Sequence, residues 1–273
     1  MAKLPEQSIE SQIIEELNGP TLSKTPRGYL GYSGLGDNCN RKIWYGFRWV
    51  VKGGINGRIR RLFQRGHDEE VTIRKEFQRF GADIIDDQKE VIGFEGHVRG
   101  HIDGVLVNTK WFNEDILIEI KTYNASRFKT LVKKTVKESD YTYYCQMQSY
   151  MGRLRLNKAL FIATCKNDDH RYIEIVNFNK DVFDILERKS EEIIVTDNPP
   201  EKIGSGQSTW FECRFCGFKP ICHHNKEVDK NCRTCKYGTI KSNSIWSCGD
   251  TGKELSVNDQ LKGCENWKLL ETL

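Results

Sequence analysis

Residues 115–123, DILIEIKTY, have the pattern of a buried β-strand that carries two charged side chains in its second half. Side chains of a strand point alternately to its two faces, so the isoleucines share one face and Glu119 and Lys121 share the other. A salt bridge at a strand end would explain this pair from the local sequence alone. Any further role depends on which other side chains the fold brings to that face.

The segments around this strand predict a sheet with helices on its faces. Runs typical of strands lie at residues 89–95, 97–108, 115–123, 158–165 and 171–178. Apolar residues at helical spacing predict helices at residues 8–17, 60–79, 141–156 and 181–196, and residues 39–50 form an aromatic helix or turn. This order predicts a mixed α/β fold, an α+β mixed sheet flanked by helices.

Composition divides the chain into three parts. With 273 residues and 38% hydrophobic residues, the chain can bury an ordinary core. We expect an N-terminal segment at residues 1–57, a core at residues 58–200 and a cysteine-rich region at residues 201–273, with a linker-like stretch at residues 197–208. Seven of the ten cysteines lie in the last part, which has too little apolar material for a core without a staple.

Charge and hydropathy restrict the class of protein. No apolar run approaches the roughly 18 residues of a membrane span, and the first residues lack the pattern of a signal peptide. We therefore expect a cytoplasmic protein with no membrane partner, in which disulfides are uncommon. Basic residues form two runs, one at residues 127–137 and one made of Arg58, Arg60, Arg61 and Arg65. Such runs are usually solvated, and only a nearby active site would turn them into phosphate contacts.

Asp103 is a second acid inside an apolar strand, 16 residues before Glu119. It could be a turn aspartate preceding Gly104. Two adjacent strands could instead place Asp103 beside Glu119, and two carboxylates that close need a cation between them, or one must take up a proton. Oxygen ligands at a partly hydrated site suit Mg²⁺ or Mn²⁺. Lys121 would then orient or deprotonate the bound water, or stabilise charge on a phosphate.

Asp103 followed by Glu119-x-Lys121 resembles the motif of the PD-(D/E)XK nuclease superfamily. Upstream, residues 65–73 (RGHDEEVTI) resemble the helical motif that precedes the catalytic strands in the RecB-like branch. There either His67 or Glu70 would complete the metal shell, and their spacing on one helix face does not choose between them. Downstream, Gln146-x-x-x-Tyr150 resembles the helix of that branch that faces the active site and the DNA groove.

The first cysteine group is Cys213, Cys216 and Cys222, three ligands where a tetrahedral metal site needs four. His223 or His224 could be the fourth and would favour zinc, whereas Cys39 would favour a cluster. Cys39 with the later three cysteines resembles the iron–sulfur staple of CRISPR-associated spacer-acquisition nucleases and bacterial recombination nucleases. This resemblance implies a structural 4Fe-4S cluster that pins the two ends of the chain around the core.

The second group consists of Cys232, Cys235, Cys248 and Cys264, with one tight pair and a wider second pair. This pattern suits a structural Zn²⁺ site, although the second half is not a Cys-x-x-Cys knuckle. The tail resembles the cysteine-rich ends of phage-encoded members of this nuclease group. Other Cys and His residues are expected to be structural, namely Cys145, Cys165, His97 and His101.

The resemblance implies a PD-(D/E)XK restriction-endonuclease-like core and a metal-dependent deoxyribonuclease, in particular an exonuclease acting on DNA ends. Asp103, Glu119 and the Ile120 carbonyl would hold Mg²⁺ or Mn²⁺ together with His67 or Glu70. Lys121 would assist attack on the phosphodiester. The DNA strand would be bound through its phosphates by both basic runs and by Gln146 and Tyr150, with no recognition of the bases. If the protein is phage-encoded, its location would be the host cytoplasm.

Three other functions remain open at this point. One is a sequence- or structure-selective endonuclease, and another is a non-catalytic protein that binds DNA ends. The third is an assembly module whose tail docks a recombination or packaging protein. By analogy with relatives, the DNA partner would be single-stranded or frayed and digested 5′ to 3′. We expect the isoleucine face of residues 115–123 to meet the core and the Glu119 face to line a groove.

Overall fold

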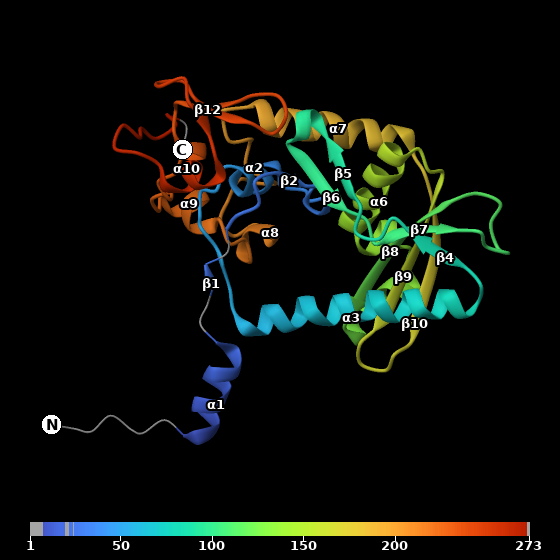
Figure 1. Ribbon diagram of the computed structural model, residues 1–273. Coiled ribbons are helices and arrows are strands. Elements are labelled where there is room, and N and C mark those ends of the chain that lie inside the picture. Colours follow the sequence, from blue (N-terminus) through green and yellow to red (C-terminus); the bar gives the residue numbers. More distant parts are fainter. Residues whose placement is uncertain (1–7, 20–21, 24, 272–273) are drawn as a thin grey trace.

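The structure is a computed structural model that describes residues 8–19, 22–23 and 25–271. A mixed sheet flanked by helices forms its centre, as predicted (Figure 1). The sheet has five strands in the order β10-β9-β8-β7-β4. Their bounds are Asp83–Ile85 (β4), Gly104–Val107 (β7), Ile116–Tyr123 (β8), Lys158–Cys165 (β9) and Arg171–Asn177 (β10). β8 and β9 are parallel, and the other neighbours pair antiparallel.

Helices cover both faces of this sheet. The helices of the first two thirds of the chain are Ile9–Asn18 (α1), Asn40–Phe47 (α2), Gly57–Arg79 (α3), Ala125–Lys133 (α4), Val136–Ser139 (α5), Tyr141–Leu154 (α6) and Lys180–Val195 (α7). Ile73 of α3 packs with the isoleucines of β8 in the smaller of two apolar cores. Leu117 of β8 lies in the larger core with Met147 and Tyr150 of α6. The prediction that the isoleucines face a packed core is therefore confirmed.

The predicted strand at residues 97–108 is wrong, because it divides into two strands of different sheets. Val98–His101 (β6) joins Leu30–Gly31 (β2) and Glu90–Gly93 (β5) in a three-stranded sheet, whereas β7 belongs to the central sheet. The break falls at Ile102 and Asp103. Around the central sheet, the elements that were not predicted include β4, α4 and α5. The last two lie in the basic run at residues 127–137, where α4 begins after Asn124, whose side chain accepts a hydrogen bond from Arg127 N.

The last 60 or so residues form small elements at one end of the molecule, coloured orange to red in Figure 1. They comprise Phe211–Arg214 (α8), Lys219–His224 (α9), Cys232–Thr234 (η3), Gly238–Ile240 (β11), Trp246–Cys248 (β12), Glu254–Leu255 (β13) and Val257–Lys262 (α10). The remaining short elements lie in the first hundred residues, namely Leu22–Ser23 (β1), Tyr32–Gly34 (η1), Gly54–Ile55 (β3) and Phe94–Gly96 (η2). In the described part of the chain, no helix is both long and apolar enough to cross a membrane.

Arg233 joins this end of the chain to the N-terminal segment. Its guanidinium group is buried and donates to the carbonyl oxygens of Phe47 (2.9 Å) and Gly28 (2.7 Å) and to Gln260 Oε1 (2.8 Å). It also lies 3.8 Å from the ring centroid of Trp49. Cation–π contacts and hydrogen bonds together compensate the loss of hydration of this charge. The two ends of the chain are thus held together by a buried cation.

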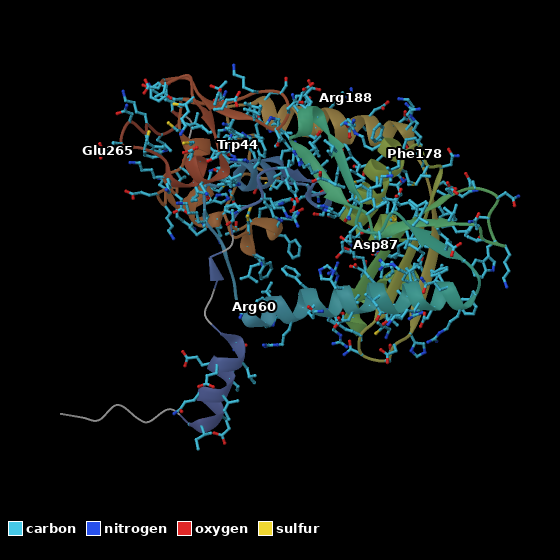
Figure 2. The ribbon with its side chains drawn as sticks, viewed as in Figure 1. Trp44, Arg60, Asp87, Phe178, Arg188 and Glu265 are labelled. Carbon is cyan, nitrogen blue, oxygen red and sulfur yellow. The ribbon has the colours of Figure 1, made fainter. Side chains whose placement is uncertain are left out.

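Nearer the middle of the chain, α2 contacts the segment that follows α7. Trp44 is fully buried and donates from Nε1 to the carbonyl oxygen of Thr196 at 2.9 Å (Figure 2). Arg48 is also buried and forms an ion pair with Asp197 at 2.7 Å. The linker-like stretch at residues 197–208 therefore starts in contact with the N-terminal segment rather than free of it.

Candidate active site

Asp103 lies beside the middle of β8 because of the pairing between β7 and β8. Gly104 pairs with Ile118 in this antiparallel register, so the preceding residue falls next to Glu119. Asp103 Oδ2 accepts a hydrogen bond from Ile120 N at 2.7 Å. Gly104 has a φ of +144°, and a Cβ atom there would lie 2.4 Å from Ile84 Cγ2. Glycine is therefore required at the point where the chain enters β7.

Lys121 places its ammonium group among three oxygen-bearing groups. Its Nζ atom lies 3.7 Å from Asp103 Oδ2 and forms an ion pair with Glu119 Oε1. It also donates to the carbonyl oxygen of Ile120 at 3.1 Å. The sequence predicted these same three groups as ligands of a metal ion. The fold thus brings them around one positive charge.

Glu119 is completely buried, with 0% of its side chain exposed. Among the described residues, Glu119 Oε2 has no hydrogen-bond partner, whereas Oε1 contacts the Lys121 ammonium group. Burial raises the pKa of Glu119 to about 7, and Lys121 partly offsets this rise. The prediction that the Glu119 face lines a groove is wrong at Glu119 itself, because α6 packs over this part of β8, whereas Lys121 on the same face keeps 21% of its side chain exposed.

The pKa of Lys121 shifts upward. Burial alone would lower it, but the carboxylates of Asp103 and Glu119 outweigh burial and raise it above its ordinary value. The ammonium group also lies 5.3 Å from the ring centroid of Tyr143. We did not predict Tyr143 from the sequence. Its position three residues before Gln146 on the same helix was the signal that could have indicated it.

Helix α3 brings Glu70 rather than His67 toward this group. The side chain of His67 is 64% exposed, whereas that of Glu70 is 16% exposed. His67 Nδ1 lies 3.5 Å from Glu70 Oε2. Burial raises the pKa of Glu70, and the negative charge of Asp103 raises it further. Glu70 therefore lies close enough to Asp103 for their charges to interact, with His67 on its solvent side.

Gln146 and Tyr150 lie on the face of α6 that points into the protein. They are 6% and 2% exposed, and Gln146 Nε2 lies 3.5 Å from the Tyr150 hydroxyl group. The ring of Tyr150 packs edge-on against Tyr32, with centroids 5.5 Å apart. Burial raises the pKa of Tyr150, and Glu119 adds to the rise. Tyr150 therefore lies near the carboxylates in the interior of the protein, with Gln146 beside it.

The donor set fits a divalent cation such as Mg²⁺ or Mn²⁺. Two carboxylates and one main-chain carbonyl already surround a positive charge, and Oε2 of the buried Glu119 carboxylate has no hydrogen-bond partner among the described residues. Hard cations prefer such oxygen ligands. Across the residues that the structure describes, however, no group of three or more His, Cys, Asp and Glu side chains has the arrangement of a metal-ion site. This holds for the carboxylates of this site and for both cysteine groups.

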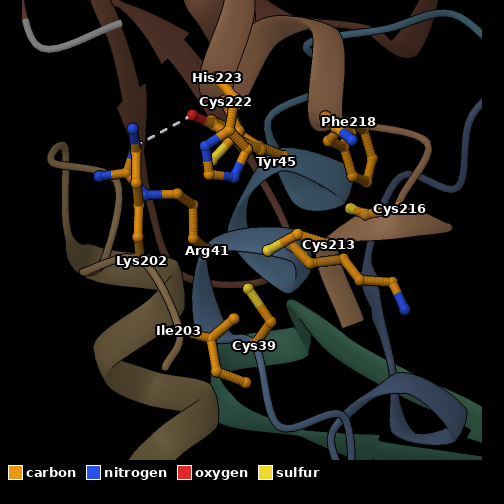
Figure 3. Close-up of a pocket in the computed structure, with 12 residues that line it drawn as sticks. Cys39, Arg41, Tyr45, Lys202, Ile203, Cys213, Cys216, Phe218, Cys222 and His223 are labelled. Carbon is orange, nitrogen blue, oxygen red and sulfur yellow. Dashed lines mark hydrogen bonds between the residues drawn. The ribbon is translucent and has the colours of Figure 1, made fainter. Parts of the chain in front are cut away.

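The first cysteine group lines one pocket between α2 and the tail (Figure 3). Its sulfur-bearing residues are Cys39, Cys213, Cys216 and Cys222, with Lys202 and His223 also in the lining. Burial raises the pKa of Cys39, and the nearby thiols of Cys216 and Cys222 raise it further. Cys39 is thus brought from the other end of the chain to the three later cysteines.

The second cysteine group gathers at η3, β12 and the segment after α10. Burial raises the pKa of Cys232 to about 11, and the charges of Cys235, Cys264 and Cys248 add to it. Cys248 follows a different trend, because hydrogen bonds from Thr251 and Asp250 outweigh burial and lower its pKa. The remaining pair, Cys145 and Cys165, is buried. His97 is also buried, and its Nε2 atom lies 2.6 Å from the carbonyl oxygen of Lys241.

Comparisons with known proteins give only distant similarities. No family profile matches the chain, and no curated protein matches it. Among solved structures, the alkaline exonuclease LHK-Exo from Laribacter hongkongensis is 17% identical, with 62% of this chain and 87% of that chain covered and a TM-score of 0.46. The same protein in complex with dAMP is 16% identical over 61% and 86%, with a TM-score of 0.46. SSO0001 is 16% identical over 80% and 92%, with a TM-score of 0.45.

Proposed function

We propose that this protein is a metal-dependent deoxyribonuclease of the PD-(D/E)XK type that acts as an exonuclease on DNA ends. One observation carries the proposal. Lys121 Nζ contacts Glu119, lies 3.7 Å from Asp103 Oδ2 and donates a hydrogen bond to the Ile120 carbonyl oxygen at 3.1 Å. A salt bridge at a strand end needs only one carboxylate. Two carboxylates, a carbonyl and a lysine around one point form a site suited to hydrolysis of a phosphodiester.

Asp103, Glu119 and the Ile120 carbonyl would hold Mg²⁺ or Mn²⁺, and Glu70 is the best placed further ligand. When bound, such a cation would polarise the scissile phosphate and lower the pKa of the attacking water. Glu119 must lose its proton to act as a ligand, and its pKa of about 7 allows this near neutral pH. His67 would remain in solvent beside Glu70.

Lys121 would act in its charged form. The neighbouring carboxylates raise its pKa, so the ammonium group is the dominant form before a metal ion binds. It would donate hydrogen bonds to the attacking water or to a phosphate oxygen on which negative charge grows. Tyr143, at 5.3 Å, would keep the ammonium group oriented. Gln146 and Tyr150 would help to position the carboxylates from the interior of the protein and would not contact DNA.

The DNA strand would be held by the two basic runs. Arg58, Arg61 and Arg65 lie on the exposed side of α3, the helix that also carries Glu70. Lys129 and Lys133 are exposed on α4, which follows β8 directly. Contacts of this kind go to phosphates and carry no base specificity. The motifs in this sequence include none that reads bases. We therefore favour an exonuclease that digests DNA from an end over an endonuclease that cuts at a specific sequence.

The cysteines would hold two structural metal groups. For the first, a 4Fe-4S cluster is supported by four thiols in the lining of one pocket, because each thiolate of such a cluster binds a separate iron atom. For the second, Zn²⁺ is supported by the closeness of Cys235, Cys248 and Cys264 to Cys232, whose pKa all three raise. Both would fix the ends of the chain and take no part in hydrolysis.

End-labelled linear DNA and closed circular DNA with Mn²⁺ test the nuclease. We expect the wild type to degrade linear DNA and leave circles intact, and Lys121→Ala to reduce the rate at least 100-fold. Lys180→Ala, which removes an exposed lysine of α7, is the matched control and should act like the wild type. Intact linear DNA would refute the nuclease. Equal cutting of circles would instead favour an endonuclease.

Protein purified without oxygen tests the cysteine sites. A brown preparation whose colour is lost in Cys39→Ser but kept in Cys165→Ser would support the cluster. Zinc that is lost in Cys232→Ser would support the second site. A colourless, zinc-only wild type would exclude the cluster.

A further inference from the structure

The turn at residues 86–89 connects β4 of the central sheet to β5 of the three-stranded sheet. Asp86 and Gln88 have positive φ angles of 56° and 55°, a conformation that residues other than glycine rarely adopt. Backbone strain of this kind persists only where the surrounding contacts hold it, and it is common at functional sites. The turn is therefore held by its contacts rather than by its own conformational preference.

One set of these contacts fixes the residue before Asp103. Gln88 N donates to the carbonyl oxygen of Ile102 at 3.1 Å, and Ile102 N donates to the carbonyl oxygen of Lys89 at 3.2 Å. Ile102 is fully buried and directly precedes Asp103. Two main-chain hydrogen bonds on one residue restrain its backbone. The turn thus fixes the point from which the Asp103 carboxylate projects.

A second set of contacts ties the same turn to α3, the helix that carries Glu70. Asp87 forms an ion pair with Arg74, which lies one helical turn after Glu70 (Figure 2). Gln88 Nε2 donates a hydrogen bond to Glu70 Oε2 at 3.2 Å. Residues four apart lie on the same side of a helix, so both contacts fall on one face of α3. The turn therefore connects the two sides of the candidate site, Asp103 and Glu70.

The contacts of Glu70 leave one of its oxygen atoms unused. Gln88 Nε2 and His67 Nδ1 both meet Oε2, at 3.2 Å and 3.5 Å. No residue in the described part of the chain donates a hydrogen bond to Oε1. The lone pairs of Oε1 are thus available to a cation. The amide of Gln88 is neutral, so it holds the carboxylate without cancelling the negative charge that attracts a cation.

We propose that Gln88 is a positioning residue for the metal ion, because it holds Oε2 of Glu70 and leaves Oε1 available as a ligand. This proposal rests on the proposed deoxyribonuclease function and adds to it a residue outside the motifs. A glutamate side chain has three rotatable bonds, so an unheld Glu70 would lose this orientation. Loss of such a hydrogen-bonded neighbour typically weakens metal binding by about 10- to 100-fold. His67 gives less support, because it is 64% exposed.

Isothermal titration of the full chain with Mn²⁺, without DNA, tests the proposal. Gln88→Met keeps the length of the side chain and removes the donor, so we expect it to weaken Mn²⁺ binding about 10-fold. Gln64→Met is the matched control, because Gln64 Nε2 also donates to a carboxylate of α3, Asp68 Oδ1, at 2.8 Å. It should bind Mn²⁺ like the wild type. Both variants should unfold at the same urea concentration as the wild type, since both glutamines are exposed.

A double substitution shows whether Gln88 acts through Glu70. Glu70→Ala should weaken Mn²⁺ binding and leave Asp103 and Glu119 as ligands. Adding Gln88→Met to Glu70→Ala should cause no further loss, because the hydrogen bond no longer has an acceptor. A turn that only supports the fold would give the same loss in both backgrounds. Where Glu70→Ala binds Mn²⁺ too weakly to titrate, the comparison of Gln88→Met with Gln64→Met decides alone.

Three outcomes would overturn the proposal. If the wild type bound Mn²⁺ and degraded DNA but Gln88→Met bound Mn²⁺ equally tightly, the positioning role would be refuted while the nuclease stood. If Gln88→Met weakened binding equally with and without Glu70, the turn would act on the fold and not on this carboxylate. If the wild type neither bound Mn²⁺ nor degraded DNA, the proposed function would fall and the role of Gln88 with it.

Discussion

Lys121 Nζ lies 3.7 Å from Asp103 Oδ2. Lys121 is in β8, whereas Asp103 immediately precedes the neighbouring strand β7. The same ammonium group contacts Glu119 and the Ile120 carbonyl. A positive charge therefore already stands among the oxygen atoms that would bind a metal ion. Under the proposed function, the stability of the protein, its affinity for metal and its activity would depend on the same few atoms.

The first prediction concerns pH and Glu119. Its pKa rises from 4.5 to about 7 on folding, so between these values the folded state holds a proton that the unfolded state has lost. Stability in EDTA should fall as pH rises through this window, and the cost should be complete above about pH 7. Glu119→Gln should therefore be more stable than the wild type by about 1 to 3 kcal/mol at pH 8, and by less at pH 5.

Thermal unfolding at both pH values measures this difference. Glu114→Gln is the control, because Glu114 is a more exposed carboxylate paired with Lys158. It should give no gain at pH 8. If Glu119→Gln increased stability equally at both pH values, the claim that the buried Glu119 carboxylate takes up a proton on folding would be contradicted.

The second prediction separates metal binding from hydrolysis. Lys121→Met removes a positive charge from the oxygen-lined position but keeps a long apolar side chain. Because like charges no longer repel, Mn²⁺ should bind about 5-fold or more tightly, as a gain of roughly 1 kcal/mol implies. Cleavage should still be lost. Isothermal titration with Mn²⁺ measures the first effect, and weaker Mn²⁺ binding would argue that Lys121 supports the site in another way.

The third prediction concerns the glycine after Asp103. A Cβ atom at Gly104 would lie 2.4 Å from Ile84 Cγ2, and the φ of +144° is one that other residues rarely adopt. Gly104→Ala should destabilise the protein by about 2 kcal/mol or more. Gly66→Ala is the matched control, because nothing lies within 4 Å of its Cβ position inside α3. There alanine should be neutral or stabilise by up to about 1 kcal/mol. Urea unfolding of both variants decides between these expectations.

The fourth prediction concerns Arg233. Lysine cannot reproduce the planar group that reaches Phe47, Gly28 and Gln260 while lying 3.8 Å from the Trp49 ring centroid. Arg233→Lys should cost about 2 to 4 kcal/mol, because buried carbonyl oxygens lose their donors. Arg188→Lys, at an exposed arginine of α7 (Figure 2), should change stability by less than about 0.5 kcal/mol. If both variants lost the same stability, the guanidinium contacts of Arg233 would contribute nothing to stability.

Local pattern was sufficient for the main elements of the sheet. Alternating and continuous apolar runs predicted β8, β9 and β10, because burial on a pleated surface leaves a period of two or an unbroken apolar run. The predicted helices at α3, α6 and α7 follow the period of 3.6 in the same way. Pattern was not sufficient at residues 97–108, where one apolar run serves two sheets.

The sequence by itself determined which chemical groups are present and their spacing, namely Asp103, Glu119-x-Lys121 and the cysteines. Only the tertiary structure decided their surroundings. The antiparallel register of β7 and β8 put Asp103 next to Ile120 N, and the packing of α6 buried Glu119 and raised its pKa. Burial, pKa and the position of Glu70 closer to the interior than His67 depend on side chains far apart in the chain. Spacing in a sequence cannot specify them, because they arise only when separate elements pack together.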